Sequence, residues 1–559
     1  MALTRHTGLT RTYEVPKDRR WPPILGAVIW LVAIAAGVAL ADGSIVTLAL
    51  PQLLRELGTS VEGVAAVLGV YCAVVAVGLP VVVRVRERWG SRRIGVGGLL
   101  LFAAASLGCA TAHSLAVLLA MRAAQGLGAA CLLVLAFDVL AVERDGVRSR
   151  RWLWTATAVL GTAAGPALGG LLAQSFGWRA IFIAQVPIAL AASLAVLAHL
   201  ERLALQPALV PAPPVAHARH EPVPMIALAL TAAALSSVLF LLVLLLVSGW
   251  GFSPLQAAGA MMLVPAGAAA VRRVGGVALT RAAAGCALLG AGVLTLAFLP
   301  SPSAWWLMAP LLVAGAGMGL ALPAIAGELL HERSPRHAAR LLAMRHAGIA
   351  LTLLLLAPII AVQVRAASAR AELQGVAALL DSSVSPGEKL KLASVVASSV
   401  QSSNPRVALA EVLAANTSGL SAADRAALGS LQRQGDAIIA QAAGDSVRAA
   451  FLITGLLALL AAVLLRPPAL APAAQRRGLR ALAGLSAAIV LLPAGYAVAK
   501  RATPIGTPQL AAPCKSGRIP HASGFSGLLQ RLAIDGLDSV ACREGITREQ
   551  LVLNLSGHG

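Results

Sequence analysis

The sequence predicts an all-α membrane protein, and three observations support this fold class. Of the 559 residues, 58% are hydrophobic and only 12% are charged, with a mean hydropathy of +0.80. A soluble protein of this length would carry about a quarter charged residues. The apolar residues fall in long runs, and the basic residues fall in short clusters between those runs. A packed core could not hide this much apolar sequence, so lipid must surround part of the chain.

Thirteen apolar runs are long enough to cross a bilayer, which takes about 17–25 helical residues. They lie near residues 23–50, 62–83, 94–111, 114–141, 152–175, 180–200, 225–249, 255–271, 277–299, 304–330, 339–364, 448–466 and 479–499. The eighth run is the weakest, because it is short and rich in Ala and Gly. Residues 1–22 are polar, and the run after them is too long for a signal-peptide core. We therefore expect a cytoplasmic N-terminus followed by a first spanning helix.

The distribution of the net charge of +21 predicts the orientation. Basic clusters near residues 84–93, 144–151 and 333–340 all lie on one side if the spans alternate. Cytoplasmic loops carry an excess of Lys and Arg, so that side is the cytoplasm. A nucleic-acid-binding protein would instead gather its basic residues on one soluble face with interleaved aromatics. We therefore expect a multi-pass membrane protein that binds no nucleic acid.

Three segments are not expected to cross the membrane. Residues 201–224 are rich in Pro and Ala, which is typical of a flexible linker, here cytoplasmic. Residues 365–447 form a polar insert with helical periodicity, and residues 501–559 form a polar tail. The alternation of spans places insert and tail outside the cytoplasm. The predicted units are the N-terminal bundle 23–200, helices 7–11 at 225–364, helix 12 at 448–466 and helix 13 at 479–499.

Two cysteines, Cys514 and Cys542, are the pair in the polar tail, whereas the other four lie in apolar runs. A tail of under 60 residues has little core of its own and often needs a covalent link. In an oxidising compartment the two should form a disulfide. Two unrelated thiols, or a metal pair with His521 as the nearby candidate ligand, are the alternatives. We predict the disulfide and no metal site. Insert and tail should also dock into one extracytoplasmic cap, because each alone is marginal in water.

Short motifs sit at the ends and in the middle of the predicted helices. Asp42-Gly-Ser-Ile-Val-Thr-Leu-Ala-Leu-Pro51 ends the first helix. The loop after the second contains Val83-Arg-Val-Arg-Glu-Arg-Trp-Gly-Ser-Arg-Arg93. The fourth helix carries Arg122-Ala-Ala-Gln-Gly-Leu-Gly128, and the fifth carries Gly161-Thr-Ala-Ala-Gly-Pro-Ala-Leu-Gly-Gly170. A single one of these patterns is modest evidence, but four in order at the appropriate helices form a strong signal.

This set resembles the major facilitator superfamily, and in particular its drug:proton antiporters with fourteen helices, of the multidrug-resistance protein B or quaternary-ammonium exporter type. The resemblance covers residues 20–365 and 448–466. Glu87 stands where the family's gating loop has Asp, and Val83 where it has Gly. Members with fourteen helices have two helices between the halves, where this chain has only the linker. The thirteenth helix and the tail are additions.

The resemblance implies a major facilitator fold of two six-helix bundles, here with one extra C-terminal transmembrane helix and the extracytoplasmic cap. It implies a bacterial inner (cytoplasmic) membrane protein with its C-terminus outside. The function implied is proton-coupled export of small amphipathic molecules, drugs or metabolites by alternating access. No enzyme activity is expected, and no cofactor besides the proton gradient. Partners would be the substrate, protons and the bilayer, around a monomeric transport unit that could meet a periplasmic adaptor.

Export against a gradient needs a group that gains and loses a proton inside the membrane. Asp42 is the acid that lies inside a span, and an intramembrane acid is functional by default. The alternative is a carboxylate bonded to water or to Ser44. Arg122 lies about 12 Å below the outer surface, too deep to reach water comfortably, and Asp42 has a comparable depth. The resemblance assigns coupling to this pair, and Gln125 could complete the polar patch.

Two further sets have mechanical roles. We expect Arg88 to pair with Asp138 and Glu87 with the other half, latching the outward-open state; a pairing of Asp138 with Arg144 is equally plausible. The gating loop and its partner comprise Glu87, Arg88, Gly90, Arg92 and Asp138. The antiporter motif comprises Gly161, Gly165, Pro166, Gly169 and Gly170, which would let the fifth helix bend and pack tightly. Close packing without movement is the simpler alternative.

The sequence contains no motif for ATP binding, hydrolysis, dinucleotide binding or metal binding. A Walker loop, a nucleophile elbow, a dinucleotide fingerprint and a metal-spaced His/Cys cluster are all absent. The alternative from a different class is a non-transporting membrane scaffold or sensor, whose insert and tail bind a partner. Replacing Asp42 separates the two, because only a transporter depends on a titratable group inside the membrane.

Overall fold

The structure is a computed structural model of the whole chain. It describes residues 23–140, 150–199, 222–329, 335–401 without 383 and 385, 405–415, 422–466, 489–502 and 524–555, together with 508, 510, 513 and 514. The N-terminal lead-in 1–22, most of the linker 201–224, Arg144, His521 and the start of the thirteenth predicted span lie outside the described residues.

The first half of the chain folds into an N-terminal bundle of helices. Its elements are α1 (Pro23–Thr47), α2 (Leu50–Glu56), α3 (Val61–Trp89), α4 (Ser91–Ala110), α5 (Leu115–Leu140), α6 (Arg150–Phe176), α7 (Trp178–Ile183) and α8 (Gln185–His199). These helices form because the apolar runs leave the backbone polar groups no partner in lipid except within the helix itself. α1 packs against α6 and α8, and α5 packs between α3 and α4.

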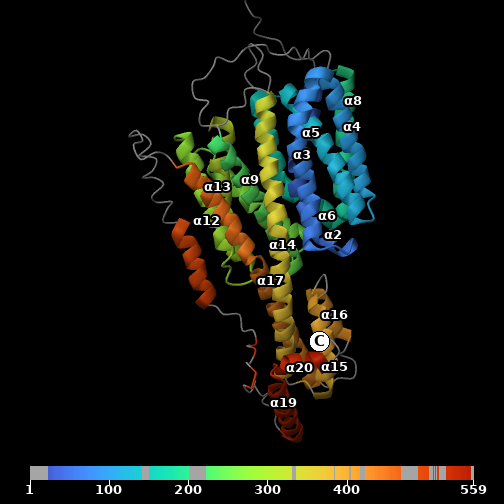
Figure 1. Ribbon diagram of the computed structural model, residues 1–559, viewed down its shortest axis with the longest axis vertical. Coiled ribbons are helices and arrows are strands. Elements are labelled where there is room, and N and C mark those ends of the chain that lie inside the picture. The colour runs from blue at the N-terminus through green and yellow to red at the C-terminus, as the bar shows by residue number, and fades with distance from the viewer. Residues whose placement is uncertain are drawn as a thin grey trace, which may run out of the picture.

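The second half forms a C-terminal bundle beside the first (Figure 1). Its elements are α9 (Pro222–Val243), the π-helix η2 (Leu244–Gly249), α10 (Pro254–Met261), α11 (Leu263–Ala270), α12 (Ala278–Leu296), α13 (Ala304–Leu322), the π-helix η3 (Pro323–Leu329), α14 (Pro335–Asp381) and α17 (Ala422–Leu464). The weak eighth run is the pair α10 and α11. The two are separated at Met262 because Pro265 has no N–H to bond the carbonyl of Met261.

The described residues of the thirteen predicted spans are mostly helical, and the number of helices that cross the membrane stays a prediction. Within the described residues, ten helices are long and apolar enough to cross a membrane. Helical residues 489–502 lie against α13, because the hydroxyl of Tyr496 donates to the carbonyl of Trp306 at 3.0 Å and the two rings meet edge to face. The described residues are therefore almost entirely helical, and the chain is a multi-pass membrane protein.

Two helices continue beyond the bundles into a separate helical cap (Figure 1). α14 runs for 47 residues and α17 for 43, so both extend well past the thickness of a bilayer core of about 30 Å. The predicted insert 365–447 is thus continuous with its two membrane helices. The stretch of α14 after Pro358 contains Gly375 but no further proline, and Ala, Leu, Gln and Arg make up most of it, so nothing ends the helix at the membrane surface.

The cap has an apolar core of its own, distinct from that of the bundles. Around the ends of α14 and α17 it contains α15 (Pro386–Gln401), α16 (Pro405–Ala415), α19 (Gly524–Glu544) and α20 (Arg548–Leu555). Val376, Leu379 and Leu380 of the insert are buried in the same cluster as Val552 and Leu553 of the tail. The tail therefore covers the apolar stripe that the insert alone would expose.

Polar contacts hold the tail in place as well. The guanidinium of Arg548 in α20 donates to Asp381 at the end of α14 at 2.7 Å, and Arg548 is buried. A disulfide joins Cys514 to Cys542, which closes a loop of the tail onto α19. The disulfide thus links two parts of the tail, and the buried Arg548–Asp381 ion pair links the tail to the insert.

Candidate functional site

The centre of the N-terminal bundle holds a completely buried ion pair. Asp42 lies near the end of α1 and Arg122 in the first third of α5, and both side chains are 0% exposed. Nη1 of Arg122 lies 2.6 Å from Oδ2 of Asp42. Nε of Arg122 donates to the carbonyl of Val67 in α3 at 3.0 Å. The guanidinium is therefore held by three helices at once.

Two glutamines extend this pair into a closed network. Gln125, one turn after Arg122, accepts from Nη1 of Arg122 at 2.6 Å and donates to Oε1 of Gln185 at 2.8 Å. Gln185, at the start of α8, donates in turn to Oδ1 of Asp42 at 3.0 Å. Ser106 of α4 accepts from Gln125 at 2.9 Å. Each member of this polar network is buried, so it is one unit shielded from lipid and water.

Aromatic side chains cover the charged end of the network. The guanidinium carbon of Arg122 lies 4.3 Å from the ring centroid of Tyr71 and 5.8 Å from that of Phe182. Tyr71 is fixed by donating its hydroxyl to the carbonyl of Ala39 at 2.8 Å. Phe182 meets buried Trp178 edge to face at 6.1 Å. Cation–π contacts with desolvated rings stabilise the charge of Arg122 without adding an acid.

The polar network holds a single acidic group. Asp42 is the carboxylate that faces Arg122, and protonating it would remove the charge that holds the guanidinium. Gln185 can still hydrogen-bond a neutral carboxyl, since its amide both donates and accepts. In the described residues no group of three or more His, Cys, Asp or Glu is placed to hold a metal ion.

Glycines bring the helices of this site into close contact. A Cβ added at Gly126 would lie 2.9 Å from the carbonyl of Tyr71, and one at Gly128 would lie 2.6 Å from the backbone of Phe102. In α6, a Cβ at Gly165 would overlap the hydroxyl of Ser44, and one at Gly169 would overlap the carbonyl of Ile45. Any side chain at these positions would therefore push α3, α4 or α1 away from the polar network.

The last glycine of the antiporter motif faces the other half of the protein. A Cβ at Gly170 would lie 2.5 Å from Cβ of Ala258 and 2.9 Å from the carbonyl of Pro254, both in α10. Nearby, the amide of Leu255 donates to Gln174 at 3.0 Å. Pro166 lies one turn earlier in the same helix, where it removes a backbone hydrogen bond, and Gly161 lies in the first half of α6. α6 and α10 thus form one contact between the bundles, near the end that carries the cap.

The gating loop corrects one predicted pairing. Asp138 at the end of α5 pairs with Arg86, whose Nε lies 2.5 Å away, and with the hydroxyl of Ser91. Arg88 is exposed, so its predicted pairing with Asp138 is wrong. The reason is that α3 continues to Trp89 rather than ending near residue 83. Two residues along a helix turn the side chain by about 200°, so Arg86 and Arg88 face opposite ways.

The other half of the protein closes over the same loop. Arg336, at the start of α14, donates to both carboxylate oxygens of Glu87 at 2.9 and 2.8 Å. Arg92 donates to the carbonyl of Leu197 at 2.6 Å, which ties the loop to α8. Gly90 has φ +80°, a conformation that favours glycine and turns the chain from α3 into α4. The bundles are therefore joined at this end too, through a two-point contact of Glu87.

Sequence reasoning found the ion pair but missed Gln185, Ser106 and Tyr71. Gln185 was visible as a strongly polar residue in a predicted span, directly before Val186-Pro187. A buried amide inside a membrane needs partners, and that rule could have pointed to the network. Ser106 and Tyr71 carry no comparable signal, because single hydroxyls in spans often bond their own helix, as Ser106 also does with Phe102.

Residues 32–362 match the family model described as Major Facilitator Superfamily. The chain is 35% identical over 165 residues to the multidrug resistance protein Stp of Mycobacterium tuberculosis, covering 28% of this chain and 31% of that protein. It is 30% identical over 181 residues to the tetracenomycin C resistance and export protein of Streptomyces glaucescens, covering 32% and 33%. The aligned part thus spans about a third of the length of these relatives.

Among solved structures, the chain is similar to a bacterial homologue of the human lysosomal transporter Spinster, in an inward-facing and occupied conformation. The TM-score is 0.54, and the match covers 80% of this chain and 97% of that one. The sequence identity is 14%, so this likeness concerns the fold alone.

Proposed function

Because the chain belongs to the Major Facilitator Superfamily, we propose that it is a proton-coupled antiporter that exports small amphipathic molecules. The relatives named for multidrug resistance and for tetracenomycin C export support the substrate class. The observation that carries the proposal is the buried polar network of Asp42, Arg122, Gln125, Gln185 and Ser106. A charge inside a membrane is costly, and such charges mark ion pathways and proton relays.

The proposed coupling starts at Asp42. Unprotonated Asp42 neutralises Arg122 and holds α1, α5 and α8 together. A proton entering from outside would convert Asp42 to the neutral acid and leave Arg122 with only neutral acceptors. The bundle would then favour a different arrangement of these helices, and release of the proton to the cytoplasm would restore the pair. The network thus gives the proton gradient a structural element with two states.

Alternating access would use the two contacts between the bundles. One is the Glu87–Arg336 pair and the other is the packing of Gly170 against α10. We propose that the end with Glu87 faces the cytoplasm, in line with the excess of Arg at that end, and that the cap lies outside. Opening one contact while the other stays closed would expose the space between the bundles to one side at a time.

Flux measurements in proteoliposomes test the proposal. The purified protein is reconstituted, a pH gradient is imposed, and the transport of amphipathic dyes and of tetracenomycin C is followed together with proton movement. Asp42→Asn should abolish gradient-driven flux at normal expression and reconstitution. Glu56→Gln is the matched control, because Glu56 is an acid of the same bundle that pairs at its surface with Arg179.

Two results would contradict the proposal. Undiminished gradient-driven flux in Asp42→Asn would remove this residue from the coupling mechanism. A wild-type protein that moves none of the compounds, and whose cap captures a partner equally well with Asp42→Asn, would favour the scaffold or sensor instead.

A further inference from the structure

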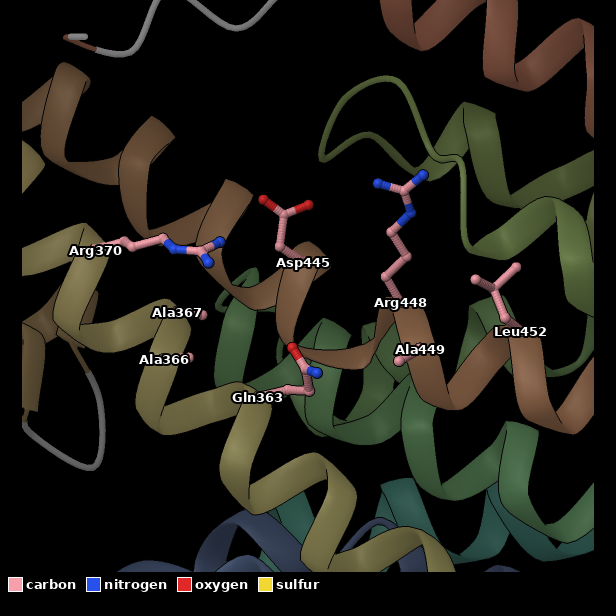
Figure 2. A pocket seen from close by; sticks show the side chains of 8 residues that line it. All are labelled: Gln363, Ala366, Ala367, Arg370, Asp445, Arg448, Ala449 and Leu452. Carbon is pink, nitrogen blue, oxygen red and sulfur yellow. The ribbon is translucent and has the colours of Figure 1, made fainter. Parts of the chain in front are cut away.

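A pocket lies between α14 and α17 (Figure 2), where both helices leave the bundle (Figure 1). Its volume is about 310 Å³, which is at the lower end of the range for small-ligand sites. The lining residues are Gln363, Ala366, Ala367 and Arg370 of α14, and Asp445, Arg448, Ala449 and Leu452 of α17. The three alanines explain why the space is open, since side chains this small cannot bridge two diverging helices.

The charges of the pocket are unbalanced. The carboxylate of Asp445 lies 3.6 Å from Nζ of Lys500, so Asp445 already has a cationic partner. Neither Arg370 nor Arg448 has a carboxylate of any described residue within 4.0 Å. In Figure 2 the Arg370 side chain extends from α14 toward Asp445 of α17, and in this view the Asp445 carboxylate lies between the guanidinium groups of Arg370 and Arg448. Two guanidinium groups from two helices therefore border one pocket with a single, shared acid.

Arg448 is exposed, and its guanidinium lies over an aromatic ring. Its guanidinium carbon lies 5.2 Å from the ring centroid of Phe298, which follows the end of α12. An arginine on an aromatic face keeps its five N–H donors available at the edge of the plane. The pocket thus has one donor group from α17, a second donor group from α14 and the amide of Gln363.

The position of the pocket limits what could fill it. Phe298 lies in the loop between α12 and α13, and Lys500 lies near the end of helical residues 489–502. Both mark the level at which the bundle ends on the cap side. In the proposed orientation this is the level of the lipid headgroups on the outer face. Lys and Arg are depleted on that face of membrane proteins, so two adjacent arginines there need a reason.

We propose that this pocket binds a phosphate group, held between Arg370 and Arg448 and hydrogen-bonded by Gln363. The planar fork of arginine matches phosphate oxygens in a bidentate manner, and such charge-assisted bonds are about twice as strong as neutral ones. The alanine walls would accept the small carbon groups attached to a phosphate diester. The phosphate could belong to an anionic phospholipid of the outer leaflet or to a soluble phosphate, because both present the same oxygens.

A bound phosphate would link the two helices that carry the cap. Arg370 belongs to α14 and Arg448 to α17, so one ligand that contacts both would fix the spacing of these helices where they diverge. The site therefore predicts an effect of phosphate on the coupling between bundles and cap that does not depend on the proton site at Asp42. The proposal rests on the orientation given under the proposed function, but a failure of proton-coupled transport would leave the phosphate site untouched.

Binding to the full-length protein in nanodiscs tests this site. One arm uses nanodiscs of phosphatidylcholine with added sodium phosphate, and sodium chloride at equal ionic strength as reference. The other arm compares phosphatidylcholine alone with phosphatidylcholine containing phosphatidylglycerol, and native mass spectrometry counts the lipids that stay bound. The test variant is Arg370→Gln with Arg448→Gln. The matched control is Arg365→Gln with Arg501→Gln, two exposed arginines of α14 and residues 489–502 that do not line the pocket.

We expect the test variant to lose at least about tenfold in affinity for the phosphate-bearing probe, and the control variant to bind like the wild type. Retention of phosphatidylglycerol alone would identify a lipid headgroup site, and binding of inorganic phosphate alone would identify a soluble anion site. Equal losses in the two variants would show diffuse surface charge and overturn the proposal. Absence of binding in both arms by a wild-type protein with a normal thermal melt would overturn it as well.

Discussion

Replacing Asp42 by asparagine tests the buried ion pair directly, because asparagine has nearly the same size and shape as aspartate but carries no charge. Arg122 keeps its proton in this variant, since guanidinium groups stay charged in proteins. It then lacks the carboxylate that lies 2.6 Å away in the wild type. Removing one partner of a buried pair costs about 3–5 kcal/mol. Both side chains are 0% exposed, so solvent screening does not reduce this figure.

Removing the arginine instead of the acid, or removing both, should lower the free energy of unfolding by less than Asp42→Asn does. In Arg122→Gln, Asp42 can bind a proton and avoid a buried charge. The double variant Asp42→Asn/Arg122→Gln leaves only amides, which can hydrogen-bond to Gln125 and Gln185. Its free energy of unfolding should therefore exceed that of Asp42→Asn, although it carries one more substitution.

Thermal unfolding of the purified variants in detergent measures these differences. At about 2–4 °C per kcal/mol for a bundle of this size, Asp42→Asn should lower Tm by roughly 6–20 °C. Thr295→Val is the control, because it removes a buried hydroxyl that bonds only the carbonyl of Ala291 within α12, and about 1 kcal/mol is expected. If the double variant is as unstable as the sum of the two single variants, Asp42 and Arg122 do not pair, and the coupling mechanism loses its basis.

Three further predictions concern packing, pH and the cap. Gly170→Leu should slow transport without unfolding the bundles, because a side chain there meets α10; normal flux would show that this contact does not matter. Burial lowers the pKa of Lys389 from 10.5 to about 8 in the folded cap. Between pH 8 and 10.5 Lys389 therefore binds a proton only in the unfolded chain, so the free energy of unfolding of the cap should rise with pH in this range. Ala393 is buried in the cap, so the denaturant concentration at which an Ala393→Cys thiol becomes labelled measures the stability of the cap. Lys389→Met should abolish its rise with pH. Deleting residues 501–559 should expose the insert to protease, and an unchanged cleavage pattern would show that tail and insert do not dock.

Much of the fold follows from the one-dimensional pattern, because lipid forces every spanning segment into a helix whose length is set by the bilayer. The same reasoning placed Asp42 and Arg122 at comparable depths, since each residue of a helix advances about 1.5 Å. Rotation about the helix axis is not fixed in this way. The face of a helix that turns inward decides which side chains meet. The pattern therefore predicts neither that Gln185 joins the polar network nor that Arg86, rather than Arg88, pairs with Asp138.

The extent of α14 and α17 could not be read from hydropathy. Hydrophobicity falls where a helix leaves the membrane, but helix propensity does not, and the residues after Pro358 include strong helix formers. The insert therefore looked like a separate unit, whereas its first and last helices are continuous with the spans. The packing of α20 on the insert also depends on contacts between segments more than 150 residues apart, such as Asp381 with Arg548.

Because α14 is continuous from the C-terminal bundle into the cap, a movement of this helix in the bundle also moves the cap. From Arg336, which holds the contact to Glu87, to Leu380 in the core of the cap, the helix advances about 66 Å at 1.5 Å per residue. A tilt of about 10° at the bundle would displace the far end by roughly 11 Å over that length. A small rotation that is hard to see among tightly packed helices would thus become a large swing in water. Pro358 is the point in α14 at which such a swing could be absorbed by bending.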